Sequence, residues 1–320
     1  MVTGGAGYIG SHIVNDLIEN NYEVIVLDNM STGNKNNIHP DSIFIVGDIK
    51  DDNTLQNVFS HNVDAVFHFA AHKAVGESMM NPMKYAVNNI SGTINLLKKA
   101  VEHGVKNFIF SSSAAVYGPP VFLPITEEHP LNPMNYYGYT KVAIEENLKW
   151  FSELTDLRYA ALRYFNATGY DIRGRVKGQE KNPANLCPVI METLCGMREQ
   201  MEVFGDDYDT PDGTCIRDYI HVNDLSTAHL KALEYIKEEK KNLVVNLGTG
   251  NGYSVTELIN AAEKVSEKKV NYKISGRRAG DPANLISDYS LAKKLMNWEA
   301  VYSDPETIFK SMLGVYFNKM

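Results

Sequence analysis

Two side chains that could act together on a proton lie in the stretch NYYGYTK, residues 135–141. Tyr137 and Lys141 stand four positions apart, so a helix would present both on one face. A neighbouring ammonium favours the phenolate and lowers the pKa of the phenol, which makes it a base for a hydroxyl proton. The same spacing recurs at Tyr289 and Lys293, and spacing alone therefore does not select the site.

Three consecutive serines favour the first of these pairs. The apolar run before Ser111, Ser112 and Ser113 predicts a strand over 107–111, immediately before the helix that carries Tyr137. Hydroxyls at the end of that strand could hydrogen-bond a substrate oxygen. We assign Ser113 to this role, with the adjacent Ser112 as the alternative. The second pair has neither a serine run nor a glycine loop nearby, and we interpret it as a surface pair on a late helix.

The glycine-rich stretch TGGAGYIGSH, residues 3–12, is typical of a turn that binds a dinucleotide. Gly4, Gly7 and Gly10 permit a tight strand-to-helix turn and a close approach of the backbone to a pyrophosphate. Apolar residues at helical spacing follow, and the N-terminus of that helix would face the phosphates. Only three residues precede Gly4, so we expect either an unusually short first strand or a clipped start.

An acidic residue after the next apolar run favours NAD as the dinucleotide. The run EVIVLDN predicts a buried strand that ends in Asp28. Asp28 comes 18 residues after Gly10, close to where the carboxylate that holds the adenosine ribose is expected. A carboxylate there would repel the 2′-phosphate of NADP, and no arginine precedes Arg158 to receive one; only Lys35 tempers this preference. Asp48 ends the following strand and is expected to face the adenine.

Strands and helices alternate through the first half of the chain. Such repeats predict an α/β fold with a doubly wound, Rossmann-type parallel sheet, whose ligands bind at the carboxyl ends of the strands. The predicted strands cover 42–46, 64–69, 107–111 and 158–164, and the predicted helices cover 52–59, 82–102 and the segment with Lys141.

Shorter elements after Asn166 predict a smaller α/β C-terminal domain for the substrate. The polar segment 170–185 contains Gly and Pro and suits a lid or a binding loop. Further elements are predicted over 186–198, 202–204, 215–225 and 243–247, with a helix from Ser254. We expect an NAD-binding domain over 1–165, with segments returning from the second half, and a substrate domain over 166–320. Arg217 and Arg278 could bind a pyrophosphate as a fork.

Composition argues against several other functions. The net charge of −8, without a basic run, disfavours nucleic acid or an anionic membrane as a partner, and no apolar run is long enough to span a bilayer. Cys187, Cys195 and Cys215 fit no metal pattern, and we expect reduced thiols in a cytoplasmic protein. His68 and His72 flank the end of a strand without an acidic partner, so we expect no metal site.

Taken together, these motifs resemble the extended short-chain dehydrogenase/reductase family, and within it the enzymes that epimerise nucleotide sugars. The resemblance covers essentially the whole chain. It rests on TGGAGYIGSH, LDN, GDI, FHFAAHKAVGES, SSSAAVYG, YYGYTK, LRYFNATG, NLCP, GTCIRDYIHVNDL and RRAGD.

The resemblance implies a role for many residues. Ser113, Tyr137 and Lys141 would be catalytic and would also contact the cofactor. The NAD site would further contain Gly4, Gly7, Tyr8, Ile9, Gly10, Asp28, Asn29, Asp48, Ile49, Phe69, Ala70, Ala71, Lys73, Asn88 and Phe165. Besides Ser113 and Tyr137, the substrate site would contain Asn166, Asn185, Phe204, Arg217, Arg278, Asp281 and Leu285.

The implied reaction interconverts UDP-glucose and UDP-galactose, as in galactose metabolism, by transient oxidation at carbon 4. A homodimer built on helices near 84–103 and 138–152 is also implied. A dehydratase of the same family would need an acid–base pair where this chain has Ala114 and Ala115. A net reductase, or a binding protein that only senses NAD, is a further alternative. Leu285 is of intermediate size, which leaves N-acetylated UDP-hexoses as additional substrates.

Overall fold

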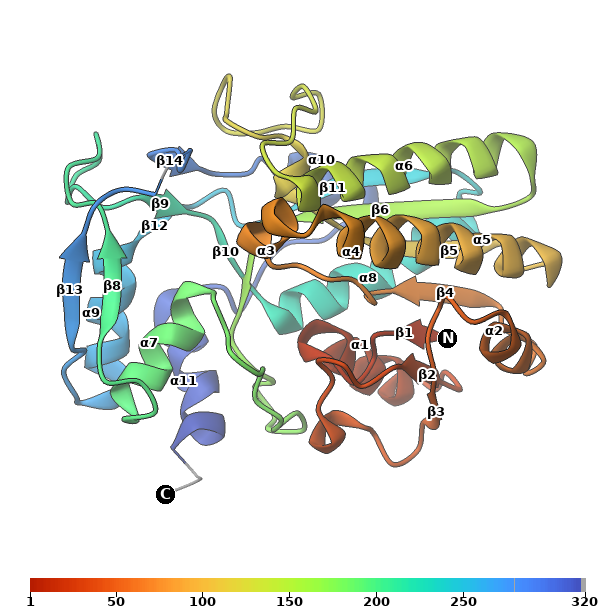
Figure 1. The fold of residues 1–320 in the computed structure, drawn as a ribbon, viewed down its shortest axis with the longest axis horizontal. Coiled ribbons are helices and arrows are strands. Elements are labelled where there is room, and N and C mark those ends of the chain that lie inside the picture. The colour runs from red at the N-terminus through yellow and green to blue at the C-terminus, as the bar shows by residue number, and fades with distance from the viewer. Residues whose placement is uncertain (279, 318–320) are drawn as a thin grey trace.

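A seven-stranded parallel sheet forms the centre of the protein. The computed structural model describes residues 1–278 and 280–317 (Figure 1). The strands follow one another across the sheet in the order β11-β6-β5-β4-β1-β2-β3. Their bounds are β1 Val2–Thr3, β2 Ile25–Asp28, β3 Ile43–Val46, β4 Ala65–His68, β5 Asn107–Ser113, β6 Arg158–Tyr164 and β11 Leu243–Leu247. This architecture confirms the predicted Rossmann-type fold.

Helices cover both faces of the sheet because alternate residues of each strand point to opposite sides. Ile109 of β5 packs with α1 and α8, whereas its neighbours Phe108 and Phe110 pack with α2, α5 and α6. The first layer contains α1 (Tyr8–Glu19), α8 (Val222–Glu238) and α10 (Ser290–Met296). The second contains α2 (Asp52–Phe59), α5 (Gly92–Glu102) and α6 (Tyr136–Leu154). Two apolar cores therefore hold the strand ends in fixed positions.

A second body of smaller elements lies beyond the carboxyl ends of the strands. Helices α7 (Leu186–Leu194), α9 (Val255–Ser266) and α11 (Pro305–Tyr316) share a third apolar core. The short strands are β7 Asn166–Thr168, β8 Met201–Phe204, β9 Ile216–Arg217, β10 Tyr219–His221, β12 Tyr253–Ser254, β13 Tyr272–Ser275 and β14 Asn284–Leu285. The chain returns to the main sheet in between, because β11 pairs with β6. The division into 1–165 and 166–320 stays a prediction.

Several elements differ from the sequence-based expectation. The helix expected over 82–102 consists of α4 (Pro82–Tyr85), a π-helical turn η2 (Ala86–Ser91) and α5. β5 continues to Ser113 instead of ending at Ser111, because the serines keep their register with β6. α7 ends at Leu194 instead of Arg198. The short helices α3 (Val75–Met80), η1 (Lys35–Asn37) and η3 (Ala114–Val116) were not predicted.

Candidate active site

The carboxyl end of β5 brings the predicted hydroxyl and phenol into contact. Ser113 is the last residue of β5, and Tyr137 lies in the first turn of α6. Asn135 fixes that turn by accepting a hydrogen bond from the Gly138 N–H (2.9 Å). The Ser113 hydroxyl lies near enough to the Tyr137 phenol to lower its pKa as a hydrogen-bond partner. The Ser112 hydroxyl instead donates to Glu145, so of the two serines Ser113 is the one that acts on Tyr137.

Lys141 is buried one turn further along α6. Its side chain donates to the backbone carbonyl of Ser111 (2.7 Å), and the residue is 2% exposed. The Nζ atom lies 5.6 Å from the centre of the Tyr137 ring. Burial lowers the pKa of Lys141 to about 7, while the carboxylate of Glu145 opposes this change. The phenol and the amine thus occupy one face of α6, as their spacing requires.

The electrostatics of Tyr137 differ from the sequence-based expectation. We expected the ammonium of Lys141 to lower the pKa of the phenol. Instead, burial raises the pKa of Tyr137, and the hydrogen bond from Ser113 opposes the rise. The Lys141 ammonium donates a hydrogen bond to the carbonyl of Ser111 on β5 and therefore interacts partly with the strand and not only with the phenol. Further positive charge beside the phenol is therefore needed to make a base near neutral pH.

The glycine turn leaves no room for side chains. A Cβ at Gly10 would lie 2.4 Å from the carbonyl oxygen of Gly4, and one at Gly4 would lie 2.8 Å from the backbone nitrogen of Ala70. Gly7 is the N-cap of α1 and supplies no side-chain cap. The first N–H groups of α1 therefore remain open toward a ligand, which fits the pyrophosphate of a dinucleotide.

The acidic residues predicted for the cofactor lie beside this turn. Asp28 is buried at the end of β2 and accepts hydrogen bonds from the N–H groups of Ala6 (3.0 Å) and Met30 (2.9 Å). Burial raises the pKa of Asp28, and these two hydrogen bonds oppose the rise. Asn29 donates to Asp48 at the end of β3 (3.0 Å). Carboxylates at neighbouring strand ends fit a ribose diol and an adenine.

The other predicted cofactor residues gather at the same edge of the sheet. Ile49 and Asn88 are buried. Tyr8, Ile9, Phe69, Ala70, Ala71 and Phe165 are half-buried. Tyr8 donates its hydroxyl to the carbonyl of Gly169, which joins α1 to the second half of the chain. Lys73 is exposed and forms an ion pair with Glu180, a partner that the sequence did not suggest.

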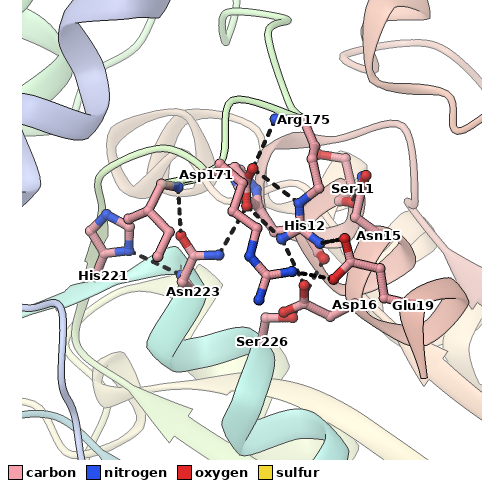
Figure 2. A network of polar contacts seen from close by, with 12 residues as sticks. Ser11, His12, Asn15, Asp16, Glu19, Asp171, Arg175, His221, Asn223 and Ser226 are labelled. Atoms are coloured by element: carbon pink, nitrogen blue, oxygen red, sulfur yellow. Dashed lines mark hydrogen bonds and ion pairs between the residues drawn. The ribbon is translucent and has the colours of Figure 1, made fainter.

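The segment 170–185, which we call the strap, is tied to α1 by charge. Figure 2 shows Arg175 between Asp171 and the acidic side chains of α1. Its guanidinium donates to Asp171 (2.5 Å) and Asp16 (2.7 Å) and forms an ion pair with Glu19 (2.7 Å). Asn223 of α8 also donates to Asp171 (3.1 Å). One arginine therefore links the strap to the helix that follows the glycine turn.

A second contact holds the strap beside the glycine turn. The Gly178 N–H donates to Asn37 (2.7 Å), and the Asn37 amide donates back to the Gly178 carbonyl (3.3 Å). A Cβ at Gly178 would lie 2.3 Å from the Asn37 side chain, so this contact requires glycine. Sequence reasoning missed these partners. Its only usable signal was the polar, Gly- and Pro-containing character of the segment.

Both predicted arginines belong to the smaller body, Arg217 on β9 and Arg278 after β13. The Arg278 guanidinium stacks 3.8 Å from the centre of the Phe204 ring. Arg217 lies 3.5 Å from Asp281, and its buried NH2 nitrogen has no hydrogen-bond partner within the described residues. This nitrogen takes part in the ion pair with Asp281 but makes no hydrogen bond to a described residue, and an anionic ligand would supply one. Ala279 of the RRAGD motif lies outside the described residues.

The remaining predicted substrate residues are Asn166, Asn185 and Leu285, which lie on other elements than the arginines and the phenol. Asn166 and Asn185 line one small cavity at the start of α7. Leu285 pairs in register with Arg217, and Leu285 and Phe165 both pack against an apolar cluster that includes Ala114, the neighbour of Ser113. β14 therefore leads from the guanidinium of Arg217 toward the end of β5.

The second Tyr-x-x-x-Lys pair is separate from these residues. Tyr289 packs edge-on against Trp298, and Lys293 pairs with Glu299. Across residues 1–278 and 280–317, no group of three or more His, Cys, Asp or Glu side chains could hold a metal ion. Within the same ranges, no helix is both long and apolar enough to cross a bilayer.

The fold and the residues at its strand ends define a dinucleotide-binding protein of the extended short-chain dehydrogenase/reductase type. Residues 1–248 match the model of the NAD dependent epimerase/dehydratase family, and the chain belongs to that family. The predicted resemblance is thereby confirmed, and so is NAD as the cofactor.

Several named relatives share nearly the whole chain. UDP-glucose 4-epimerase of Halalkalibacterium halodurans is 47% identical over 310 residues, which cover 96% of this chain and 92% of the relative. The structure of UDP-glucose 4-epimerase from Brucella ovis in complex with NAD is 44% identical, with a TM-score of 0.94, and covers 97% and 95% of the two chains. The Bifidobacterium longum enzyme in complex with NAD+ and UDP is 40% identical, with a TM-score of 0.92 and coverage of 98% and 96%.

Proposed function

We propose that this protein interconverts UDP-glucose and UDP-galactose by inverting carbon 4 of the sugar, as an isomerase (EC 5.1.3.2) of galactose metabolism. The observation that carries the proposal is the contact between Ser113 and the Tyr137 phenol, one helical turn from buried Lys141. The relatives named above are similar over almost their whole length. Bound NAD would accept a hydride from carbon 4 and return it to the opposite face of the resulting ketone.

The protein groups would manage the proton and the sugar. The phenol of Tyr137 would take the 4-hydroxyl proton and later give it back. Ser113 would hydrogen-bond the oxygen at carbon 4, and Lys141 would keep the phenolate favourable and contact the nicotinamide ribose. Because burial raises the pKa of Tyr137, the base depends on positive charge from Lys141 and from the oxidised cofactor.

The nucleotide half of the substrate would stay anchored while the sugar turns over. We infer that Arg217 and Arg278 bind the pyrophosphate and that Phe204 and Asp281 support these arginines. Asn166 and Asn185 would complete the anchor from the cavity at the start of α7. The NH2 nitrogen of Arg217, which is buried and makes an ion pair but no hydrogen bond among the described residues, supports this assignment.

The deciding experiment incubates the purified protein with UDP-galactose, without added NAD, and measures UDP-glucose. Formation of UDP-glucose would identify the substrate, the reaction and a retained cofactor together. No UDP-glucose, either alone or with NAD supplied, would contradict the proposal. The dehydratase alternative predicts a dehydrated keto sugar instead, but Ala114 and Ala115 supply no acid–base pair for elimination.

We further propose that N-acetylated UDP-hexoses are accepted, because Leu285 is half-buried and smaller than an aromatic residue. Absence of turnover of UDP-N-acetylglucosamine would contradict this. A cytoplasmic location is supported by three free cysteines.

A homodimer is proposed as the assembled form. Apolar side chains on neighbouring helices are exposed, among them Val87 and Ile94 on the η2–α5 helix and Trp150 and Leu154 on α6. Figure 1 shows α5 and α6 side by side along one side of the molecule. Two copies packed through this pair would bury these side chains in a four-helix contact.

A further inference from the structure

A buried ion pair lies one helical turn beyond Lys141. Glu145 and Arg163 have side chains that are 8% and 7% exposed, and the guanidinium donates to both carboxylate oxygens (2.5–3.2 Å). Replacing such a pair by apolar residues is often neutral or stabilising, so a buried ion pair is weak evidence for a stabilising role. Its place beside the candidate site therefore calls for another explanation.

Glu145 joins the two strands that carry the site. Ser112 and Arg163 are directly paired across β5 and β6, and Glu145 accepts hydrogen bonds from both side chains. Ser112 precedes Ser113, which contacts the phenol. The carboxylate of Glu145 thus fixes the end of β5 relative to α6, and with it the separation between Ser113 and Tyr137.

The network continues away from the site and is closed by hydrogen bonds. Arg163 donates to the Tyr117 hydroxyl (3.0 Å), and that hydroxyl donates to Asn246 of β11 (2.6 Å). These hydrogen bonds hold both the guanidinium of Arg163 and the carboxylate of Glu145 in place. Of the two charges, the carboxylate is the one that acts on Lys141, since Glu145 opposes the effect of burial on the Lys141 pKa.

Other groups also face Lys141. Tyr137 lies on the same helix, His68 approaches from β4, and the Ser111 carbonyl and hydroxyl lie on β5 with Tyr164 of β6 bonded to that hydroxyl. Burial and, to a smaller extent, the charge of Lys141 lower the pKa of His68 to about 3, so His68 is neutral at the working pH. Glu145 is therefore the negative charge that supports the ammonium of Lys141.

We propose that Glu145 is a positioning residue of the reaction: its carboxylate, which binds Ser112 and Arg163, sets Ser113 against Tyr137 and places a negative charge one helical turn from the amine of Lys141. The inference rests on the proposed function, because it assumes that Tyr137 acts as the base and Lys141 as its cationic support. Glu145 itself touches neither the phenol nor the strand-end hydroxyl of Ser113.

The first test is the pH dependence of turnover in Glu145→Gln. The neutral amine of Lys141 cannot stabilise the phenolate of Tyr137. We therefore expect kcat to fall as the pH rises through the pKa of Lys141. Removing the carboxylate lowers that pKa, and we expect the alkaline fall in kcat to begin about one pH unit lower, with KM for UDP-galactose unchanged. Glu145→Asp keeps the charge and should restore most of the wild-type profile. Glu146→Gln is the matched control, because Glu146 is the next residue on α6 and is exposed.

The second test needs no substrate. The absorbance of the NAD-loaded protein at 295 nm, with Tyr137→Phe as the blank, follows ionisation of the phenol. A less protonated Lys141 supports phenolate less well, so Glu145→Gln should move the rise in absorbance to higher pH, whereas Glu146→Gln should not. This measurement separates the two proposals: a wild-type protein without epimerase activity contradicts the function, and the titration still decides the role of Glu145.

Unchanged profiles in both tests would overturn the inference. Glu145→Gln leaves the guanidinium of Arg163 buried without its anion, and the variant could fail to fold. In that case Glu145→Gln/Arg163→Gln removes both charges. The same two shifts in the double variant support the proposal, and their absence refutes it.

Discussion

The phenol of Tyr137 illustrates how opposing local effects set the chemistry of one residue. Burial raises its pKa, and the Ser113 hydroxyl opposes that rise. A base that must return its proton in the same cycle should favour neither the phenol nor the phenolate strongly. The buried setting, balanced by Lys141 and a charged cofactor, meets this requirement.

Changing Tyr137 to Phe should remove this base without disturbing the fold. We expect kcat for UDP-galactose to fall roughly 10²–10⁴-fold, the usual contribution of general acid–base catalysis, with the content of bound NAD unchanged. A coupled assay of UDP-glucose formation measures the effect. Tyr289→Phe provides the matched control from the second Tyr-x-x-x-Lys pair and should retain wild-type activity. A Tyr137→Phe enzyme as active as this control would contradict the assignment.

Buried histidines make the stability depend on pH. Burial lowers the pKa of His229 to about 4, against about 6.5 in an unfolded chain. As the pH falls, the unfolded chain therefore binds a proton at His229 before the folded protein does. The contribution of neutral His229 to the free energy of unfolding is complete above pH 6.5 and is lost as the pH falls toward 4. At pH 5 the loss is about 2 kcal/mol for this one residue.

Urea unfolding at pH 7 and pH 5 checks this effect. Wild-type protein should lose stability on acidification, and His229→Gln should lose about 2 kcal/mol less than wild type. His61→Gln, at an exposed position, serves as the control and should follow wild type. Equal losses in wild type and His229→Gln would contradict the expected effect of burial.

At the scale of elements, the sequence predicts best where local signals are strong. The bounds of α2 and of β6 and β11 were predicted to the residue, because a side-chain cap at Asp51 and short, mainly apolar runs mark them. The π-helical turn η2 leaves the apolar pattern intact, so periodicity does not reveal it. The partners of the strap on α1 and at Asn37 are 141 or more residues away, and local pattern carries no information about them.

The strap should open more often when its anchors on α1 lose their charge. We expect trypsin to cut within 170–185 several times faster in Asp16→Asn/Glu19→Gln than in wild type, because its basic residues then reach the protease. The variant keeps Arg173 and Arg175 as cleavage sites, so only their protection changes. Gel electrophoresis over time measures the cleavage, and Glu23→Gln controls for loss of an exposed acid nearby. Unchanged cleavage would show that the ion pairs do not hold the strap.

At the scale of the whole molecule, the candidate site draws on both halves of the chain. The sheet supplies the glycine turn, the strand-end acids and the phenol, and the smaller body supplies the arginines. The sequence predicted the residue types of each group, because motifs are local. It did not predict that β14 would link Arg217 to the neighbourhood of Ser113, since this depends on the pairing of β9 with β14.

The proposed dimer makes a prediction at this same scale. Trp150 is 63% exposed on α6, and a glutamate there would bring a charge into a buried apolar contact. We expect Trp150→Glu to elute as a monomer when its mass is measured by light scattering, whereas wild type elutes as a dimer. Ile274→Glu changes an exposed apolar residue on β13, away from this face, and should remain dimeric. A dimeric Trp150→Glu would argue for another interface.

The return of the chain to β11 limits how such a protein can be rearranged by recombination. A cut after residue 165 would leave the first fragment without the edge strand of its sheet and without α8, which packs under it. Neither half is then a portable module. Exchange of sugar specificity between relatives should therefore proceed by substitution within loops and short strands, not by swapping contiguous halves of the gene.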